Sequence, residues 1–163
     1  MMSNKKDYEE HLDYLKSQGV FDYRRDKEYW GNIPTPYTML GELENIYAPS
    51  MKLLDLGCGS GQVLRFASNI GFDVTGVEID ASFEKYLKDY NYIIEDMRKL
   101  PESFYKGFDV VFSYLPLKQG EEDFVQYLID TVEVGTYLVL PFHVVQDDRL
   151  KCIVHSYYQK TTI

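Results

Sequence analysis

The sequence has little of what marks several specialised classes of protein. Its 163 residues include two cysteines and three histidines, too few for a disulfide framework, and the histidines lack the spacing of a metal site. No apolar run approaches the roughly 18 residues of a membrane-spanning helix. The first ten residues lack the apolar segment of a secretory signal. We therefore expect a cytoplasmic protein without a membrane partner, a structural disulfide or a bound metal.

Basic residues are also scarce. The 17 Lys and Arg are outnumbered by 26 Asp and Glu, which gives a net charge of −9. A nucleic-acid-binding surface needs clustered Lys and Arg, so we expect no nucleic-acid partner. A basic protein or a small cationic molecule suits this charge better. The length and the 45% hydrophobic content fit one globular domain with a single core.

The most informative segment is residues 53–61. An apolar strand there runs into glycines at alternate positions, Gly57, Gly59 and Gly61, with Asp55 two residues before the first, and a helical pattern follows. Glycines allow a sharp turn and close approach of a ligand to the backbone, and the helix start directs unpaired N–H groups at that ligand. The pattern therefore predicts a nucleotide-cofactor loop. A tight turn without a ligand is one alternative.

A dinucleotide site is the second alternative. The dinucleotide fingerprint G-x-G-x-x-G places its third glycine one residue later, where this chain has Gln62. An acid at Asp55 would repel a pyrophosphate, whereas it would attract a cationic amino-acid group.

The pattern Asp55-x-Gly57-x-Gly59-x-Gly61 resembles motif I of the class I methyltransferases that use S-adenosylmethionine as cofactor. The resemblance covers about residues 33–140. It implies an α/β fold with a Rossmann-like sheet flanked by helices, and a cofactor contacted by Asp55 and by residues of the loop. These loop residues are Gly57, Cys58, Gly59 and Gly61, with Cys58 as a small filler and not a nucleophile.

The next strand, predicted at residues 72–78, ends in Glu78 about 20 residues after the glycine loop. An acid at this distance accepts hydrogen bonds from ribose hydroxyls in a βαβ unit, so Glu78 is the predicted ribose ligand, and Ile79 beside it is assigned to the same site. Asp80 is predicted to cap a helix with apolar positions at Phe83, Leu87 and Tyr90.

Residues 92–97 are predicted to form a short third strand that ends in acids. The methyltransferase resemblance implies that Asp96 accepts a hydrogen bond from the adenine amino group and that Met97 packs on the base. Two alternatives stay open: Glu95 takes this role instead, or Asp96 only caps the turn that follows.

The fourth strand, predicted at residues 108–112, leads into a loop at residues 113–117. Ligands of open α/β sheets bind at the carboxyl ends of the strands, so Ser113 is a predicted cofactor contact and Tyr114 the candidate catalytic residue, with Glu121 a second candidate base. The loop lacks the Asn/Asp-Pro-Pro-Tyr/Phe sequence of methyltransferases that modify nucleobases or glutamine. A further helix is expected at residues 121–131 and a fifth strand at residues 136–140.

The two ends of the chain lie outside this core pattern. Residues 1–32 are predicted to be an N-terminal helical extension or lid, and residues 33–163 the cofactor-binding domain. The first helix should end near Gly19 and a second should begin at Thr35-Pro36. The aromatic segment between them either closes over the cofactor, with residues 20–37 mobile until it binds, or packs the first helix onto the core.

The C-terminal part of the sheet is expected to be reduced. A strand hairpin built from residues 142–145 and 150–158, with its turn at residues 146–149, would replace the longer segment of the usual fold.

Residues 33–36, Ile-Pro-Thr-Pro, and the Tyr-Leu-Pro loop at residues 114–116 are similar to segments of small prokaryotic protein-lysine methyltransferases with broad specificity. This narrower resemblance implies an amine acceptor, with protein lysine as one candidate. A small-molecule methyltransferase, a cofactor-binding module without catalysis and a nucleotide-linked oxidoreductase are the alternatives. The sequence leaves the oligomeric state open.

Overall fold

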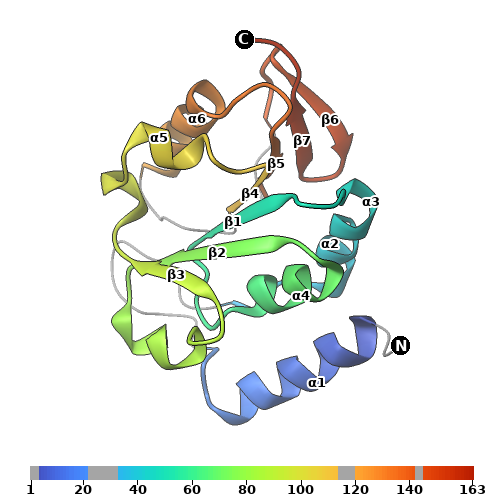
Figure 1. Cartoon of the computed structure of the whole chain (residues 1–163), viewed down its shortest axis with the longest axis vertical. Coiled ribbons are helices and arrows are strands. Elements are labelled where there is room, and N and C mark those ends of the chain that lie inside the picture. The colour runs from blue at the N-terminus through green and yellow to red at the C-terminus, as the bar shows by residue number, and fades with distance from the viewer. Residues whose placement is uncertain (1–3, 22–32, 114–119, 142–144) are drawn as a thin grey trace.

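The chain folds around one mixed β-sheet (Figure 1). The computed structural model describes residues 4–21, 33–113, 120–141 and 145–163. In these residues the sheet has the strand order β3-β2-β1-β4-β5-β7-β6, in which β7 pairs antiparallel with both neighbours and the other pairs are parallel. The strands are β1 (Lys52–Leu56), β2 (Asp73–Glu78), β3 (Asn91–Ile94), β4 (Val110–Ser113), β5 (Tyr137–Val139), β6 (Leu150–Val154) and β7 (Tyr157–Lys160).

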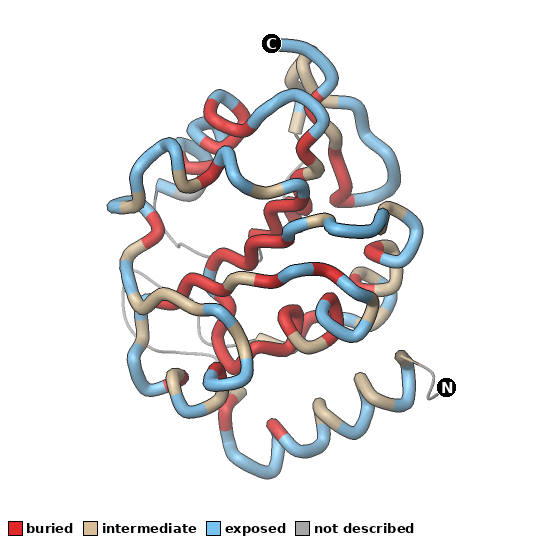
Figure 2. Tube along the Cα trace, in the orientation of Figure 1, coloured by how far each residue is buried: buried red, intermediate tan, exposed pale blue. Residues whose placement is uncertain are grey.

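Helices cover both faces of this sheet. They are α1 (Asn4–Ser17), α2 (Tyr37–Gly41), α3 (Leu43–Ile46), α4 (Gln62–Ile70), α5 (Glu102–Tyr105) and α6 (Glu121–Thr131), with short 3-10 helices η1 (Ala81–Tyr86) and η2 (Met97–Lys99). Successive strand residues bury opposite faces: Leu53 packs in the cluster under α2 to α4, and Leu54 in the cluster under α5 and α6. The central strands are therefore buried along most of their length (Figure 2), which confirms the predicted α/β class.

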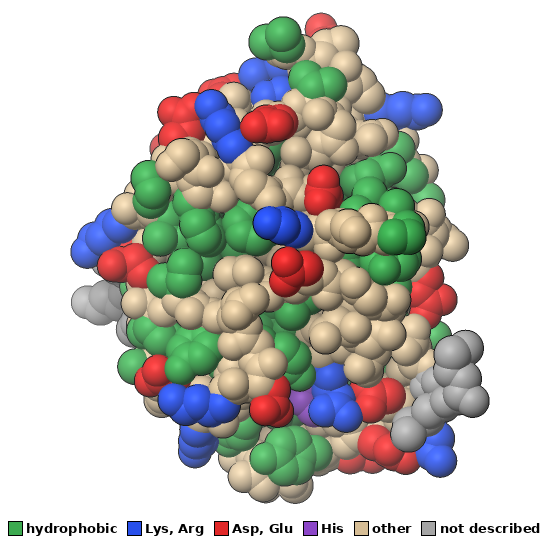
Figure 3. Space-filling model, in the orientation of Figure 1, with side chains coloured by type: hydrophobic (Ala, Val, Ile, Leu, Met, Phe, Trp, Pro, Cys, Tyr) green, Lys and Arg blue, Asp and Glu red, His purple; other side chains and the backbone are tan. Residues whose placement is uncertain are grey.

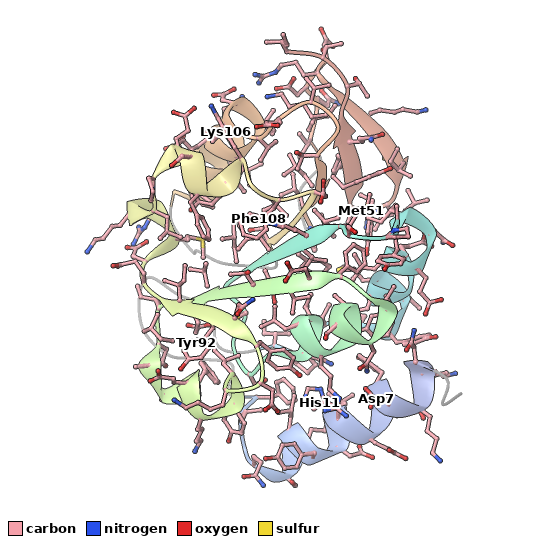
Figure 4. The ribbon with its side chains drawn as sticks, viewed as in Figure 1. Asp7, His11, Met51, Tyr92, Lys106 and Phe108 are labelled. Atoms are coloured by element: carbon pink, nitrogen blue, oxygen red, sulfur yellow. The ribbon has the colours of Figure 1, made fainter. Side chains whose placement is uncertain are left out.

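Helix α1 forms an outer layer on α4, with the side chains of Asp7 and His11 directed toward α4 (Figure 4). The Asp7 carboxylate accepts two hydrogen bonds from the Arg65 guanidinium, at 3.0 and 2.8 Å. The Tyr8 ring packs with Tyr37 and Phe66. The helix ends before Gly19, as predicted, and Gly19 adopts a positive φ of 69° that favours glycine.

The second predicted helix differs from the expectation. It begins at Tyr37, its cap position is Pro36 and not Thr35, and no side chain caps it. The chain also divides this helix into α2 and α3 at Glu42. The first backbone hydrogen bonds of the helix run to Pro36 O, so Thr35 lies one residue ahead of the cap, where its N–H donates to Gln62 Oε1. Asp80 does cap the next element through Ser82 N–H, but that element is the 3-10 helix η1.

The C-terminal hairpin exists, but its turn and its second strand were predicted wrongly, and residues 142–144 of the first predicted strand lie outside the described residues. Strand β6 pairs with β7, and the turn lies at His155-Ser156, where Ser156 has a φ of 71°. Residues 147–149 instead form a local turn in which the Arg149 guanidinium donates two hydrogen bonds to the Asp147 carboxylate. Strand β7 pairs with β5, and this pairing is favourable because it buries Tyr157 and Tyr158.

Two further predictions concern segments outside the described residues. The aromatic segment at residues 22–32 lies there, and so does Tyr114. In the described part of the chain, no helix is long and apolar enough to cross a membrane.

Candidate functional site

The strand register brings the predicted site residues to one edge of the sheet. Leu56 at the end of β1 lies opposite Val77 of β2 on one side and Ser113 of β4 on the other. Glu78 in turn lies opposite Ile94, the last residue of β3. The glycine loop, Glu78, Ser113 and the acids after β3 therefore all follow the carboxyl ends of neighbouring parallel strands, which is where open α/β sheets bind ligands.

The glycine loop folds over the end of β2. Gly57, Gly59 and Gly61 all have positive φ angles, of 75°, 53° and 86°, which explains their alternate spacing because other residues rarely adopt this conformation. The N–H groups of Gly57 and Cys58 both donate to Val77 O, at 2.8 and 3.0 Å. The loop ends at Gly61, the cap residue of α4, so the start of this helix faces the same edge.

Glu78 holds the glycine loop in place. Its Oε1 accepts a hydrogen bond from Gly59 N–H at 2.8 Å, and its Oε2 accepts one from Asp80 N–H at 2.9 Å. Both oxygens of the carboxylate are therefore fixed at the edge of the sheet where the ribose of a cofactor is predicted to lie. Ile79, the next residue, exposes 42% of its surface and offers an apolar surface beside it.

Asp55 is a buried acid on the central strand β1, opposite Gly76 of β2 and Phe112 of β4. It is 2% exposed, and burial raises its pKa well above the ordinary value, with the neighbouring Glu78 carboxylate as the second cause. No hydrogen bond among the described residues reaches its carboxylate. A carboxylate in this setting gains most from a cationic partner, which matches its predicted role beside an ammonium group.

Cys58 is a packing residue. Burial is the main cause that raises its pKa well above the ordinary value, and Asp55 and Glu78 add to it, so the thiol is not activated as a nucleophile. A Cβ at Gly76 would lie 2.6 Å from the Cys58 Sγ. Its side chain fills this space, its N–H donates to Val77 O and its O accepts from Gly61 N–H, so Cys58 holds the shape of the loop.

Asp96 caps the short helix η2 after β3. A capping role for Asp96 was one of the alternatives that the sequence left open. It accepts hydrogen bonds from Arg98 N, Nε and Nη2 at 2.9, 3.0 and 2.8 Å, and these bonds hold its pKa below the ordinary value. Glu95 is exposed and accepts from Asp96 N–H. Met97 is buried in the cluster that holds Tyr105, whose hydroxyl donates to Met97 O. The adenine contact of Asp96 and Met97 stays a prediction.

Two buried polar atoms of the site have no partner among the described residues: the hydroxyl of Ser113 and Nε2 of Gln62. Ser113 was predicted as a cofactor contact. The sequence pattern did not predict a role for Gln62, which stands where the dinucleotide fingerprint has a glycine. The available signal was a polar residue at the first position of a helix that is otherwise apolar on its inner face.

The two candidate bases, Tyr114 and Glu121, have no described side-chain contacts. Tyr114 lies outside the described residues, and Glu121 is placed only as the first residue of α6. The described residues contain no group of three or more His, Cys, Asp or Glu that could hold a metal ion.

Comparisons with known proteins agree with this geometry. Residues 54–129 match the family model of a methyltransferase domain. No curated protein matches the chain. Among solved structures, a TehB-like SAM-dependent methyltransferase from Corynebacterium glutamicum is similar with a TM-score of 0.55 and 19% identity, over 82% of this chain and 69% of that one.

Two further structures share the fold. TehB from Haemophilus influenzae has a TM-score of 0.54 and 19% identity over 66% of this chain and 41% of its own. The plantazolicin methyltransferase BpumL, solved with a monoazolic desmethylPZN analog and SAH, has a TM-score of 0.54 and 20% identity over 80% and 53%. The chain thus spans about half of these two proteins. Residues 54–129 thus match a methyltransferase domain, and the sheet order and the glycine loop agree with the fold of class I S-adenosylmethionine-dependent methyltransferases.

Proposed function

We propose that the protein binds S-adenosylmethionine at the carboxyl ends of β1 to β4 and transfers its methyl group to an amine. The observation that carries this proposal is the Glu78 carboxylate, fixed by Gly59 N–H at 2.8 Å between the glycine loop and the end of β2. This arrangement joins a ribose acceptor to the loop that receives the amino-acid part of the cofactor.

The residues of the site fit the groups of this cofactor. Asp55 would pair with the ammonium group, since a buried acid with a raised pKa is stabilised by a cation. Glu78 would accept from the ribose hydroxyls beside Ile79. Asp96 retains about one acceptor site for the adenine amino group, next to Met97. The unpaired Ser113 hydroxyl supplies a donor at the end of β4.

The protein itself has little chemistry to perform. The cofactor, when bound, supplies a methyl group that is already activated by its sulfonium. Residues of the chain then have to hold the acceptor nitrogen in line with this methyl group and exclude water. We assign the orientation of the nitrogen to Tyr114. An amine must arrive unprotonated, and Tyr114 and Glu121 are the candidate bases.

Charge supports an amine acceptor over a nucleic acid. The net charge of −9 attracts cations and repels phosphates. On the face shown in Figure 3, acidic and basic side chains are interspersed and form no basic stripe. The loop at residues 113–117, Ser-Tyr-Leu-Pro-Leu, lacks the sequence of nucleobase methyltransferases. Protein lysine is the acceptor that residues 33–36 favour, and a small-molecule amine is the alternative.

One labelling experiment tests the proposal. The protein is incubated with methyl-labelled S-adenosylmethionine and separate fractions of cell protein, nucleic acid and small molecules. Label on lysine in the protein fraction is the expected result. Label in nucleic acid would refute the amine assignment, and label only in small molecules would refute lysine. No transfer at all, with S-adenosylhomocysteine still bound in calorimetry, would favour a binding module.

A further inference from the structure

Helix α1 contacts two elements that continue from the candidate site. It runs alongside α4, which starts directly after Gly61 (Figure 1). Near its C-terminal end, the fully buried Leu15 lies in one cluster with Phe83 of η1, the short helix that Asp80 caps. Because Glu78 Oε2 accepts from Asp80 N–H, α1 packs on one element that continues from the glycine loop and on one that continues from the predicted ribose acid.

The Tyr8 hydroxyl provides a direct link between α1 and the start of α4. It donates to Thr35 O at 2.6 Å, and Thr35 N–H donates to Oε1 of Gln62, the first residue of α4, at 2.8 Å. The Gln62 side chain also lies beside this hydroxyl, where it opposes the rise in the Tyr8 pKa that burial causes. Tyr8 thus fastens α1 to Thr35 and, through Thr35, to the residue that follows the glycine loop.

The rest of the α1 interface is small. Asp7 binds Arg65 of α4, and the Tyr8 ring packs against Phe66. Of the residues of α1, only Leu15 is buried. Segments with few buried apolar contacts open at a lower free energy than the core does. Helix α1 can therefore open while the sheet stays folded, and the hydrogen bonds of Tyr8 form only when it is docked.

We infer that docking of α1 and binding of the cofactor stabilise each other, with Tyr8 as the positioning residue that couples them. This inference rests on the proposed function and extends it to control of that site by α1. The docked helix holds Thr35 and Gln62 together beside the glycine loop, and so fixes the start of α4 before a ligand arrives. A ligand that prefers this arrangement must favour docking by the same factor by which docking favours the ligand.

Hydrogen exchange measured with and without S-adenosylhomocysteine tests this coupling. In the unaltered protein, the ligand should slow exchange of the α1 amides by about fivefold or more, as coupled sites require. Strand β6 is the internal control, because it is exposed and lies at the opposite end of the sheet from β2 and β3. Equal slowing in α1 and β6 would indicate general stabilisation of the chain and would overturn the inference, as would unchanged exchange in α1.

Tyr8→Phe and Tyr47→Phe are matched variants for the role of Tyr8. Each keeps the ring and loses one hydroxyl that donates to a backbone carbonyl, at the start of α4 for Tyr8 and at Gly71, after the end of α4, for Tyr47. Tyr8→Phe should weaken S-adenosylhomocysteine about fivefold, the effect of one hydrogen bond, and should reduce the slowing of exchange in α1. Tyr47→Phe should change neither, and equal effects of the two variants would overturn the assignment of Tyr8.

Failure of the proposed function would give a different result. If calorimetry shows that S-adenosylhomocysteine does not bind the unaltered protein, the cofactor assignment fails and the inference fails with it. If the ligand binds without slowing exchange in α1, the cofactor assignment stands and the coupling is wrong. Should Tyr8→Phe not fold, the comparison of α1 with β6 in the unaltered protein still decides whether the coupling exists.

Discussion

The Glu78 carboxylate accepts a hydrogen bond from Gly59 N–H at 2.8 Å, across a separation of 19 residues along the chain. This one bond ties the middle of the glycine loop to the end of β2. Glu78 therefore has two duties in the proposed site, since it shapes the loop in the ligand-free protein and accepts from ribose when the cofactor binds.

Replacement of Glu78 should separate these duties. Glu78→Ala removes both and should weaken S-adenosylhomocysteine by about 1.5–3 kcal/mol, the value of hydrogen bonds to a charged group. Glu78→Gln keeps one oxygen for Gly59 N–H and should lose less. Calorimetric titration measures both, with the exposed Glu133→Gln as a control for loss of a negative charge. Unchanged affinity in Glu78→Ala, or tight binding of NAD, would contradict the assignment.

The site was predictable where a local pattern determines it. The spacing of Gly57, Gly59 and Gly61 follows from their positive φ angles, and Glu78 follows from its distance along the chain to the loop. The role of Asp96 was not decidable, because Arg98 two residues later binds its carboxylate and sequence gives no measure of that competition. Gln62 was missed because its importance depends on Thr35, which lies 27 residues away.

In the fold, too, local patterns predicted some elements, whereas others depend on contacts between distant residues. Apolar runs predicted β1 and β4, because buried parallel strands are continuous in hydrophobicity, and the methyltransferase resemblance implied the Rossmann-like sheet that contains them. The hairpin turn was misplaced because residues 146–149, Gln-Asp-Asp-Arg, have turn-forming composition, while the turn itself uses His155-Ser156. Pairing of β7 with β5, which buries Tyr157, is a tertiary effect that local propensity does not report.

Lys160 should stabilise the fold as a cap of α6. Its Nζ donates to Ile129 O at 2.7 Å and to Val132 O at 2.8 Å, and the residue is 5% exposed. Lys160→Met would leave these carbonyls without a donor, so we expect the free energy of unfolding to fall by about 2 kcal/mol. Urea denaturation measures this change. Lys151→Met on the exposed edge strand β6 is the control, and equal effects of the two substitutions would show that Lys160 is no cap.

His11 should make the protein less stable in mild acid. Burial lowers its pKa to about 4, Arg65 adds to the effect and Asp7 opposes it. The folded protein therefore binds a proton less readily than the unfolded chain, whose histidine titrates near the ordinary value of 6.5. The stability contribution is complete above about pH 6.5 and is lost as the pH falls toward about 4.

The substitution His11→Gln removes the titrating group at the interface of α1 and α4. Its melting temperature should fall less than that of the unaltered protein between about pH 7 and about pH 5. His155→Gln changes an exposed histidine in the β6–β7 turn and should leave the pH dependence unaltered. If the two variants follow the same curve, His11 has no special part in acid sensitivity.

Asp55 should reduce the stability of the ligand-free protein at neutral pH in exchange for cofactor binding. Burial and then Glu78 raise its pKa well above the ordinary 3.8, so the folded protein holds a proton that the unfolded chain releases. Its contribution to stability is complete below about pH 3.8 and is lost as the pH rises through the raised pKa. Asp55→Asn, which never ionises, should therefore melt at a higher temperature than the unaltered protein at about pH 8.

The same substitution should weaken the cofactor, because an amide cannot pair with its ammonium group as a carboxylate does. We expect S-adenosylmethionine to bind about tenfold more weakly or worse, so that stability and affinity move in opposite directions. Melting curves and calorimetry on one preparation measure both, with Asp73→Asn at the exposed start of β2 as the matched control. A variant that loses stability and affinity together would mean that Asp55 supports the fold, and one that keeps full affinity would leave the ammonium group without its proposed partner.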